Sequence, residues 1–161
     1  MNRKYDLDYY FNKINEIRKI RPNISISTDV IVGFPGEDEE LFLQTINTCR
    51  KIGFSKIHVF PYSERRGTKA SIMDGKIDNS VKKDRARRLI EVSHELEIEY
   101  MKKFIGLDVD VLIEETIDGC SYGHTGNYLY VKINKELPHN KIVTVNLRDI
   151  SYPYLISVEK A

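Results

Sequence analysis

The chain has 161 residues, 41% of them hydrophobic and 30% charged, and its 25 Lys and Arg against 24 Asp and Glu give a formal net charge of +1. This composition is typical of a soluble globular protein and argues against a nucleic-acid binder that acts through a basic tail. The sequence has no run of about 18 apolar residues and no signal-peptide pattern, so we expect a cytoplasmic protein without a membrane span.

Helical and strand-like patterns alternate up to about residue 104. The predicted elements are a helix between Asp6 and Pro22, a strand over 24–32, a helix from the acidic residues 37–40 to Gly53, a strand over 56–60, a loop over 63–77 and a helix from about 78 to 104. The first strand ends in a continuous apolar run, which is typical of a parallel strand covered on both faces. This order of elements predicts a parallel α/β sheet or barrel.

After residue 104 the pattern changes to alternation of apolar and polar residues. Alternating runs are found at 107–113, 128–133, 143–148 and 154–158. Four or five short strands in this remaining segment suit a small closed barrel of the OB or SH3 kind. We therefore predict two domains, 1–104 and 105–161.

The segment 28–37 crosses the carboxyl end of the first strand, where α/β sheets and barrels bind ligands. Gly33 and Gly36 let the backbone approach a ligand, and Phe34 offers a flat surface for a nucleobase. The segment lacks the Gly-Lys-Ser/Thr of a phosphate loop, and its helix starts with acids. A neutral or cationic ligand with a purine ring is therefore favoured. A plain tight turn into a capped helix is the alternative.

The segment 58–68 follows the second strand in the same way. His58 lies in an apolar strand, where a core histidine is expected more often than a general base. Arg65 and Arg66 follow in the loop and could hold an anion such as RNA phosphate, with solvated loop charges as the alternative. A further basic stretch over 82–88 reads as a solvated helix face.

In the run 128–133, aliphatic residues alternate with tyrosine and lysine. If the aliphatic residues face the core, then Tyr128, Tyr130 and Lys132 face outward, an arrangement suited to base stacking and phosphate contact. Coverage of the tyrosines by neighbouring loops is the alternative. The candidate RNA-binding residues of this part are His124, Tyr128, Tyr130, Lys132 and Arg148.

Taken in order, these segments resemble the C-terminal part of the radical-SAM methylthiotransferases, most closely the type that acts on N6-threonylcarbamoyladenosine beside the tRNA anticodon. The matching stretches are 1–5, 28–37, 58–63 with 67–68, and 124–125 with 127–129. The resemblance implies an α/β partial (βα) barrel followed by a small all-β barrel of the OB/SH3-like TRAM type that binds RNA. It further implies methylthiolation at C2 of a modified adenosine, with the tRNA anticodon stem-loop as partner.

The same resemblance implies S-adenosylmethionine and 4Fe-4S clusters, one of them held by a Cys-x3-Cys-x2-Cys loop. This chain has only Cys49 and Cys120 and no such loop, so we expect a truncated family member without catalytic or metal-binding residues that is inactive alone. The residues implied to face the cofactor are Arg3, Thr28, Asp29, Ile31, Gly33, Phe34, Phe60 and Tyr62.

The sequence is also compatible with two alternatives, a non-catalytic RNA-binding module and a family member acting on another adenosine or on a ribosomal protein.

Truncation has a structural consequence as well, because the strand over 24–32 would lack a neighbouring strand on one side. An unpaired apolar edge invites pairing with another chain. We therefore predict self-association through that edge.

Overall fold

The computed structural model describes residues 4–159, and its fold divides the chain into two compact units. Unit 1 comprises residues 1–22 and 26–97, and unit 2 comprises residues 23–25 and 98–161. The division falls within a long helix whose last turns pack into unit 2, whereas the sequence pattern changes after residue 104. Within residues 4–159, none of the helices combines the length and apolar character that crossing a membrane would require.

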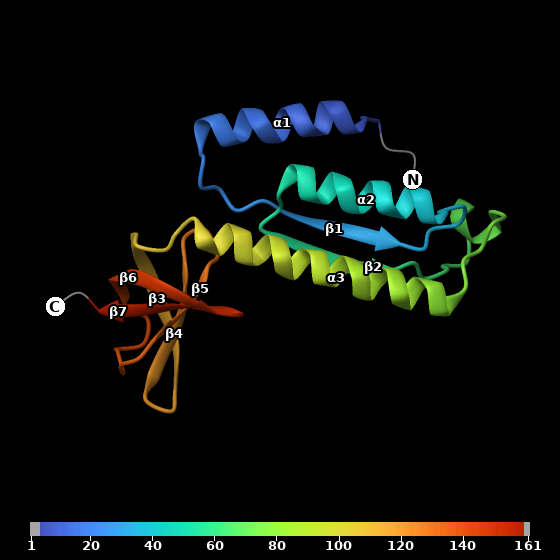
Figure 1. Cartoon of the computed structure of the whole chain (residues 1–161). Helices are drawn as coiled ribbons and strands as arrows, with labels where there is room; N and C mark the ends of the chain where they lie inside the picture. Colours follow the sequence, from blue (N-terminus) through green and yellow to red (C-terminus); the bar gives the residue numbers. More distant parts are fainter. Residues whose placement is uncertain (1–3, 160–161) are drawn as a thin grey trace. The chain divides into compact units, whose positions relative to one another are not determined.

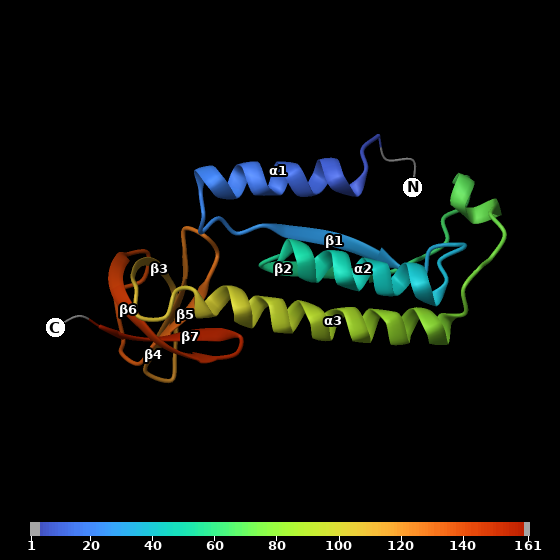
Figure 2. The same cartoon turned by 45° about the horizontal axis from the view of Figure 1, so that its top comes forward.

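Unit 1 contains a two-stranded parallel sheet and helices that run alongside it (Figures 1 and 2). Its elements are α1 (Leu7–Ile20), β1 (Ser27–Val32), α2 (Glu39–Ile52), β2 (Lys56–Pro61), the short 3-10 helix η1 (Lys69–Ile72) and α3 (Asn79–Lys102), which continues into unit 2. The register runs from Ser27 opposite Lys56 to Val32 opposite Pro61. The mixed α/β class predicted for this part is confirmed.

Side-chain caps set the helix ends of unit 1. The Asp6 carboxylate accepts a hydrogen bond from the Tyr9 amide at 2.8 Å, which confirms the predicted start of α1. Asp38 caps α2 in the same way through the Leu41 amide. Gly53 ends α2 with a φ of 67°, a left-handed conformation that glycine adopts readily. Arg18 then joins α1 to this end by donating to the carbonyls of Ile52 and Gly53.

The sheet of unit 1 is covered on one face only. Val32 and Ile57 are buried in a core that α1, α2 and α3 complete. Successive strand residues point to opposite faces, so Ile31 and Phe60 lie on the other face, 38% and 49% exposed. The expectation of a strand covered on both faces is therefore wrong for this chain. His58 shares the open face and is exposed, so its interpretation as a core histidine is also wrong.

Unit 2 is a five-stranded structure in which every strand has two neighbours. Its strands are β3 (Asp108–Ile117), β4 (Cys120–Thr125), β5 (Tyr130–Ile133), β6 (Ile142–Ser151) and β7 (Tyr154–Glu159). They close in the order β3-β4-β5-β7-β6, with β5 and β7 parallel and the other pairs antiparallel. The predicted all-β character of this part is confirmed. Leu129, Val131 and Ile133 face the core, as the alternation predicts.

Strand β4 was missing from the predicted strands, because its inward residues are small. Ser121 is fully buried, Thr125 is 7% exposed, and between them Gly123 is buried too. A Cβ atom at Gly123 would lie 1.9 Å from the carbonyl oxygen of Leu112, so only glycine permits this approach of β3 and β4. A strand with Ser, Gly and Thr inside shows no apolar alternation, which is the signal that identified the other strands.

Candidate functional site

The two strands of unit 1 end side by side, at the segments expected to meet a ligand. Val32 lies opposite Pro61, and the Tyr62 amide donates to the Val32 carbonyl at 2.8 Å. Beyond the strands, the rings of Phe34 and Tyr62 meet edge to face with centroids 5.3 Å apart. Segments 28–37 and 58–68 therefore form one corner of the unit, as the sequence predicts.

The open face of the sheet carries two cross-strand pairs. Asp29 lies opposite His58, and Ile31 lies opposite Phe60. All four side chains are exposed. This face therefore offers a carboxylate and an imidazole beside an apolar patch that ends at the aromatic corner.

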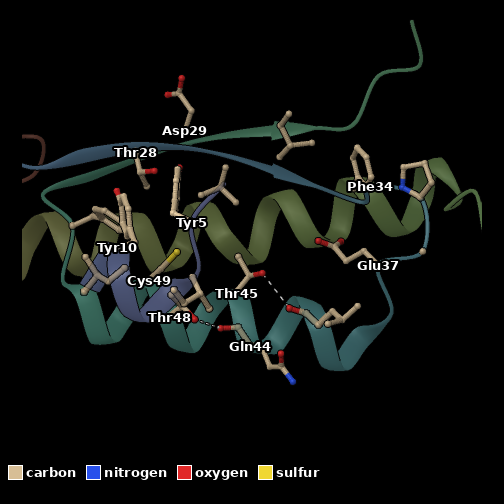
Figure 3. A pocket seen from close by; sticks show the side chains of 18 residues that line it. Tyr5, Tyr10, Thr28, Asp29, Phe34, Glu37, Gln44, Thr45, Thr48 and Cys49 are labelled. Carbon is tan, nitrogen blue, oxygen red and sulfur yellow. Dashed lines mark hydrogen bonds between the residues drawn. The ribbon is translucent and has the colours of Figure 1, made fainter. Parts of the chain in front are cut away.

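A groove of about 650 Å³ runs along the outer edge of β1, between that strand, α1 and α2 (Figure 3). Such a volume is within the range of small-molecule sites. Of the predicted cofactor residues, those that line the groove are Thr28, Asp29, Ile31 and Phe34. Asp29 points to the opposite side of β1 from Thr45 (Figure 3). Phe60 and Tyr62 do not line the groove, because they belong to the β2 side of the sheet.

The glycine turn after β1 is held by contacts within unit 1. Gly33 has a φ of 72°, and its amide donates to the Glu37 carboxylate at 2.6 Å. A Cβ atom at Gly33 would come within 2.4 Å of the Lys82 side chain. Gly33 therefore allows a close approach of the backbone to Lys82 rather than to a ligand, and its N–H is already bonded to Glu37. These contacts hold the turn and so fix the position of Phe34 at the aromatic corner.

A buried ion pair supports the same turn. Arg85 donates to the Glu37 carboxylate at 2.9 Å and to the Glu37 carbonyl at 2.8 Å, and the two side chains are 6% and 12% exposed. The prediction of a solvated basic face is therefore wrong at Arg85. It holds for Arg87, which is 60% exposed and pairs with Asp84 and Glu91. The hydrogen bond from Arg87 lowers the pKa of Asp84.

Unit 2 carries an aromatic surface, defined by Tyr122, His124, Tyr130, Lys132 and Tyr154. The rings of His124 and Tyr130 stack at 4.6 Å with an angle of 11° between planes, and the Tyr154 ring lies 4.9 Å from that of Tyr130. Pairing of β4 with β5 places Tyr122 opposite Lys132 and His124 opposite Tyr130, and β7, which carries Tyr154, pairs with the other side of β5. The sequence alone does not indicate Tyr122 and Tyr154, because β4 carries no apolar alternation and Tyr154 belongs to a strand pattern that says nothing of its neighbours.

Glutamates flank this aromatic surface. The Tyr130 hydroxyl donates to the Glu115 carboxylate at 2.6 Å, and this hydrogen bond raises the pKa of Tyr130 above its ordinary value. His124 Nδ1 lies 2.5 Å from a Glu114 carboxylate oxygen. The Tyr130 hydroxyl and the His124 Nδ1 atom are thus already engaged by glutamates of β3.

The other predicted RNA-binding residues are exposed at separate places. Tyr128 is 83% exposed in the turn before β5 and has a φ of 63°. Arg148 is exposed in β6 of unit 2, and Arg65 and Arg66 are exposed in the loop after β2 of unit 1. Arg3, predicted to face the cofactor, lies outside the residues that the structure describes.

Among residues 4–159, no three His, Cys, Asp or Glu side chains are grouped so that they could hold a metal ion. Cys49 and Cys120 are free cysteines. Burial of Cys49 in the core of unit 1 raises its pKa to about 11, which keeps the thiol protonated at neutral pH.

No protein-family model matches the chain, but curated proteins do. It is 38% identical over 160 residues to threonylcarbamoyladenosine tRNA methylthiotransferase MtaB of Bacillus subtilis (strain 168), an alignment that covers 96% of this chain and 36% of the relative. It is 39% identical over 154 residues to tRNA-2-methylthio-N(6)-dimethylallyladenosine synthase of Lachnoclostridium phytofermentans, covering 92% of this chain and 34% of the relative. The chain thus spans about a third of the length of these relatives.

Proposed function

Because this chain belongs to the methylthiotransferase family, matching about a third of the length of its curated relatives, we propose that it supplies part of the cofactor pocket and the RNA-binding domain of a tRNA methylthiotransferase. The observation that carries the proposal is the 38% identity over 160 residues, since it extends across both units. Under this proposal residues 1–104 form part of a (βα) barrel and residues 105–161 form a TRAM-like barrel. The reaction proposed for the whole enzyme is methylthiolation at C2 of a modified adenosine.

The residues at the strand ends of unit 1 fit S-adenosylmethionine. Its purine ring needs an apolar surface, which Ile31 and Phe60 offer, and its cationic groups need a carboxylate, which Asp29 offers. The Tyr62 hydroxyl is buried and has no hydrogen-bond partner among the described residues, so it is a polar atom of this corner whose partner the structure does not contain. When bound, S-adenosylmethionine supplies the methyl group and, with a 4Fe-4S cluster, one-electron chemistry.

The remaining residues proposed for this pocket act on its shape. Gly33 and its turn hold Phe34 against the Tyr62 ring, and Thr28 lies half-buried on β1, where it lines the groove. Arg3 is assigned to the pocket by the family resemblance. These residues are proposed to shape the pocket and position a ligand, and none of them is proposed to transfer a proton or a group.

For unit 2 we propose that the aromatic surface, with Tyr128 and Arg148, contacts the tRNA anticodon stem-loop, and that Arg65 and Arg66 of unit 1 contact its phosphates. Unpaired loop bases stack on rings such as those of His124 and Tyr130, and each such contact is sequence-tolerant. Glu114 and Glu115 flank the rings and oppose a phosphate there. Base contact rather than backbone contact is therefore favoured at the centre of the surface.

Calorimetric titration with S-adenosylmethionine tests the pocket. We expect the chain to bind it and Phe60→Ala to weaken binding several-fold, because the exposed ring on the open face is lost. Ile90→Ala is the matched control, since Ile90 is 40% exposed but lies on α3 outside the site. Absence of binding by the native chain, or equal binding by both variants, would contradict the assignment of this face.

We further propose that the chain is inactive alone, as it has no three-cysteine loop. Anaerobic reconstitution with iron and sulfide should therefore give no cleavage of S-adenosylmethionine. A second candidate function, a non-catalytic RNA-binding module, is favoured by the closed structure of unit 2 and its aromatic surface. Salt-dependent tRNA binding in a gel shift without any S-adenosylmethionine binding would support that module instead. The two relatives are named for different modified adenosines, so we propose one or the other of these nucleosides as the substrate.

A further inference from the structure

The hairpin of β4 and β5 ends in a tight turn that carries one exposed aromatic side chain. The Thr125 amide donates to the Leu129 carbonyl at 3.0 Å, and the Tyr128 amide donates to the Thr125 carbonyl at 2.9 Å. The loop between the two closing residues therefore consists of Gly126, Asn127 and Tyr128. A hairpin loop of this length places its last residue in the left-handed conformation, where glycine is favoured.

Tyr128 occupies that left-handed position, with a φ of 63°. Of the three non-glycine residues with a positive φ within residues 4–159, the other two are Asp118 and Asn140, types that tolerate this conformation. A bulky side chain such as that of tyrosine adopts it only with strain. Gly126, by contrast, has no positive φ, and a Cβ atom there would meet no other atom within 4 Å. The ring thus stands where the turn favours glycine, and the glycine stands where the turn does not require one.

The Tyr128 side chain does not stabilise unit 2 through burial. It is 83% exposed, whereas Tyr122, Tyr130 and Tyr154 are half-buried and lie against one another. The left-handed conformation lowers the stability of the turn, and an exposed ring does not offset that loss. Strained residues that the rest of a fold holds in place are found most often where a ligand binds. A contact with a bound molecule therefore accounts for a tyrosine at this position.

A hydrogen-bond network fixes the turn that carries the ring. The Thr125 hydroxyl donates to the Asn127 side-chain oxygen at 2.6 Å and accepts from the Leu129 amide at 3.0 Å. The Asn127 side-chain nitrogen donates to the Tyr100 hydroxyl at 3.1 Å, and that hydroxyl donates to the Asn23 carbonyl at 2.8 Å. Tyr100 is itself buried in the core of unit 2. The turn is therefore held in place before a ligand arrives, which reduces the ordering that binding requires.

We propose that Tyr128 stacks on an unpaired base of the tRNA, at a position separate from the aromatic surface, and that Asn127 is the positioning residue that holds the ring there. The proposal rests on the proposed function of unit 2 and identifies one base contact that its hairpin makes. Tyr128 lies two residues before Tyr130, at most about 7 Å along the chain. A single strand with one base on the aromatic surface therefore reaches Tyr128 with a nearby base. Such stacking is sequence-tolerant, because every base has a π-face.

The test is filter binding of an anticodon stem-loop RNA to the full chain, with the melting temperature of each variant measured by circular dichroism. Tyr128→Gly should weaken RNA binding about tenfold, because a base-stacking ring is lost. The same substitution should raise the melting temperature by a few degrees, because glycine adopts the left-handed conformation without strain. Tyr128→Phe keeps the ring and should bind like the native chain. Tyr128→Leu keeps an apolar side chain without a ring face and should bind as weakly as Tyr128→Gly.

Asn127→Ala tests the positioning role. It leaves the Tyr128 ring in the chain but removes the hydrogen bonds that join Asn127 to Thr125 and Tyr100, so RNA binding should weaken several-fold. In the Tyr128→Gly background the same substitution should leave the remaining affinity unchanged, because no ring is left to position. A residue that only stabilised the fold would lower the affinity equally in both backgrounds.

Four results would overturn the proposal. They are equal RNA binding by Tyr128→Gly and the native chain, native-like binding by Tyr128→Leu, a lower melting temperature for Tyr128→Gly, and an Asn127→Ala effect that is the same in both backgrounds. The second would assign the contact to an apolar side chain rather than to stacking. A native chain that binds no stem-loop would contradict the proposed function of unit 2 as well, whereas unchanged binding by Tyr128→Gly would contradict this proposal alone.

Discussion

Unit 1 and unit 2 each contain a β-sheet, but the pairing of the strand edges differs between the two sheets. In unit 2 each of the five strands is paired on both sides, and Val131, Val145 and Leu147 are fully buried inside. In unit 1 two strands share one covered face, and within residues 4–159 no strand pairs with the outer edge of β1. Unit 2 therefore pairs its strands internally, whereas unit 1 leaves backbone groups of β1 unpaired by any described strand and leaves apolar side chains such as Ile31 and Phe60 exposed.

The same difference separates the two candidate sites. The site of unit 1 lies on the open face of the sheet and at the strand ends, where a ligand would cover side chains that are now exposed. The aromatic surface of unit 2 lies on the outside of a closed structure, so a ligand there adds to a surface that is already complete. We expect the stability of unit 1 to depend strongly on its buried ion pair, and the stability of unit 2 to depend on the apolar side chains of its core.

The largest effect is expected from Arg85→Met in unit 1. Removing one partner of a buried ion pair leaves Glu37 uncompensated, which costs about 3–5 kcal/mol of folding free energy. Urea unfolding followed by circular dichroism measures the loss. Arg87→Met is the control, because Arg87 is 60% exposed and exposed ion pairs contribute little. Equal effects of the two substitutions would show that the buried pair of Arg85 with Glu37 does not stabilise unit 1.

Leu147→Ala should have the next largest effect, in unit 2. Leu147 is fully buried, and truncation of such a leucine costs about 2–5 kcal/mol. Its exposed neighbour Arg148 provides the control, since Arg148→Ala should change stability by no more than about 0.5 kcal/mol. Hydrogen exchange read by mass spectrometry should show the loss in peptides of β3–β7. Equal loss of protection across unit 1 would show that the two units are not separate in stability.

Tyr130→Ala tests whether the aromatic surface stacks on bases. Loss of one base-stacking ring costs about 1–3 kcal/mol of binding free energy, so we expect tRNA affinity to fall by one to two orders of magnitude. Tyr130→Phe removes the hydrogen bond to Glu115 but keeps the ring, and it should bind tRNA like the native chain. Filter binding measures both variants. A Phe variant as weak as the Ala variant would assign the contact to the hydroxyl instead.

The smallest effect concerns the two cysteines. At pH 8, iodoacetamide should label Cys120 well before Cys49, because burial raises the pKa of Cys49 to about 11. A raised folded-state pKa favours folding below the ordinary thiol pKa of 9.0, so this contribution falls as pH rises from about 9 to about 11. Peptide mass spectrometry measures the labelling. Equal rates at pH 8 would contradict the burial of Cys49.

Much of the fold could be predicted from local patterns. Asp6 and Gly53 mark helix ends by their own chemistry, and the alternation after Tyr128 identifies which residues face the core of unit 2. Strand β4 could not be predicted, because Ser121 and Gly123 carry no apolar signal.

The two candidate sites could be predicted only where residues close together in the sequence form them. The strand ends of unit 1 follow from two motifs, but the aromatic surface needs Tyr122 and Tyr154 from strands whose pairing no local pattern gives. Arg85 reads as one charge in a basic run, since its partner Glu37 lies 48 positions earlier. A contact between residues so distant in sequence is created by the fold, and no local sequence pattern reveals it.

Amide hydrogen exchange of the chain alone, resolved by NMR, tests the contrast between the units most directly. We expect fast exchange for the amides of Ser27, Asp29 and Ile31, slow exchange for Val30 in the same strand, and slow exchange for Val131 and Val145 in unit 2. Equal protection of odd- and even-numbered amides along β1 would mean that its outer edge is already paired, and the contrast between the two units would then be wrong.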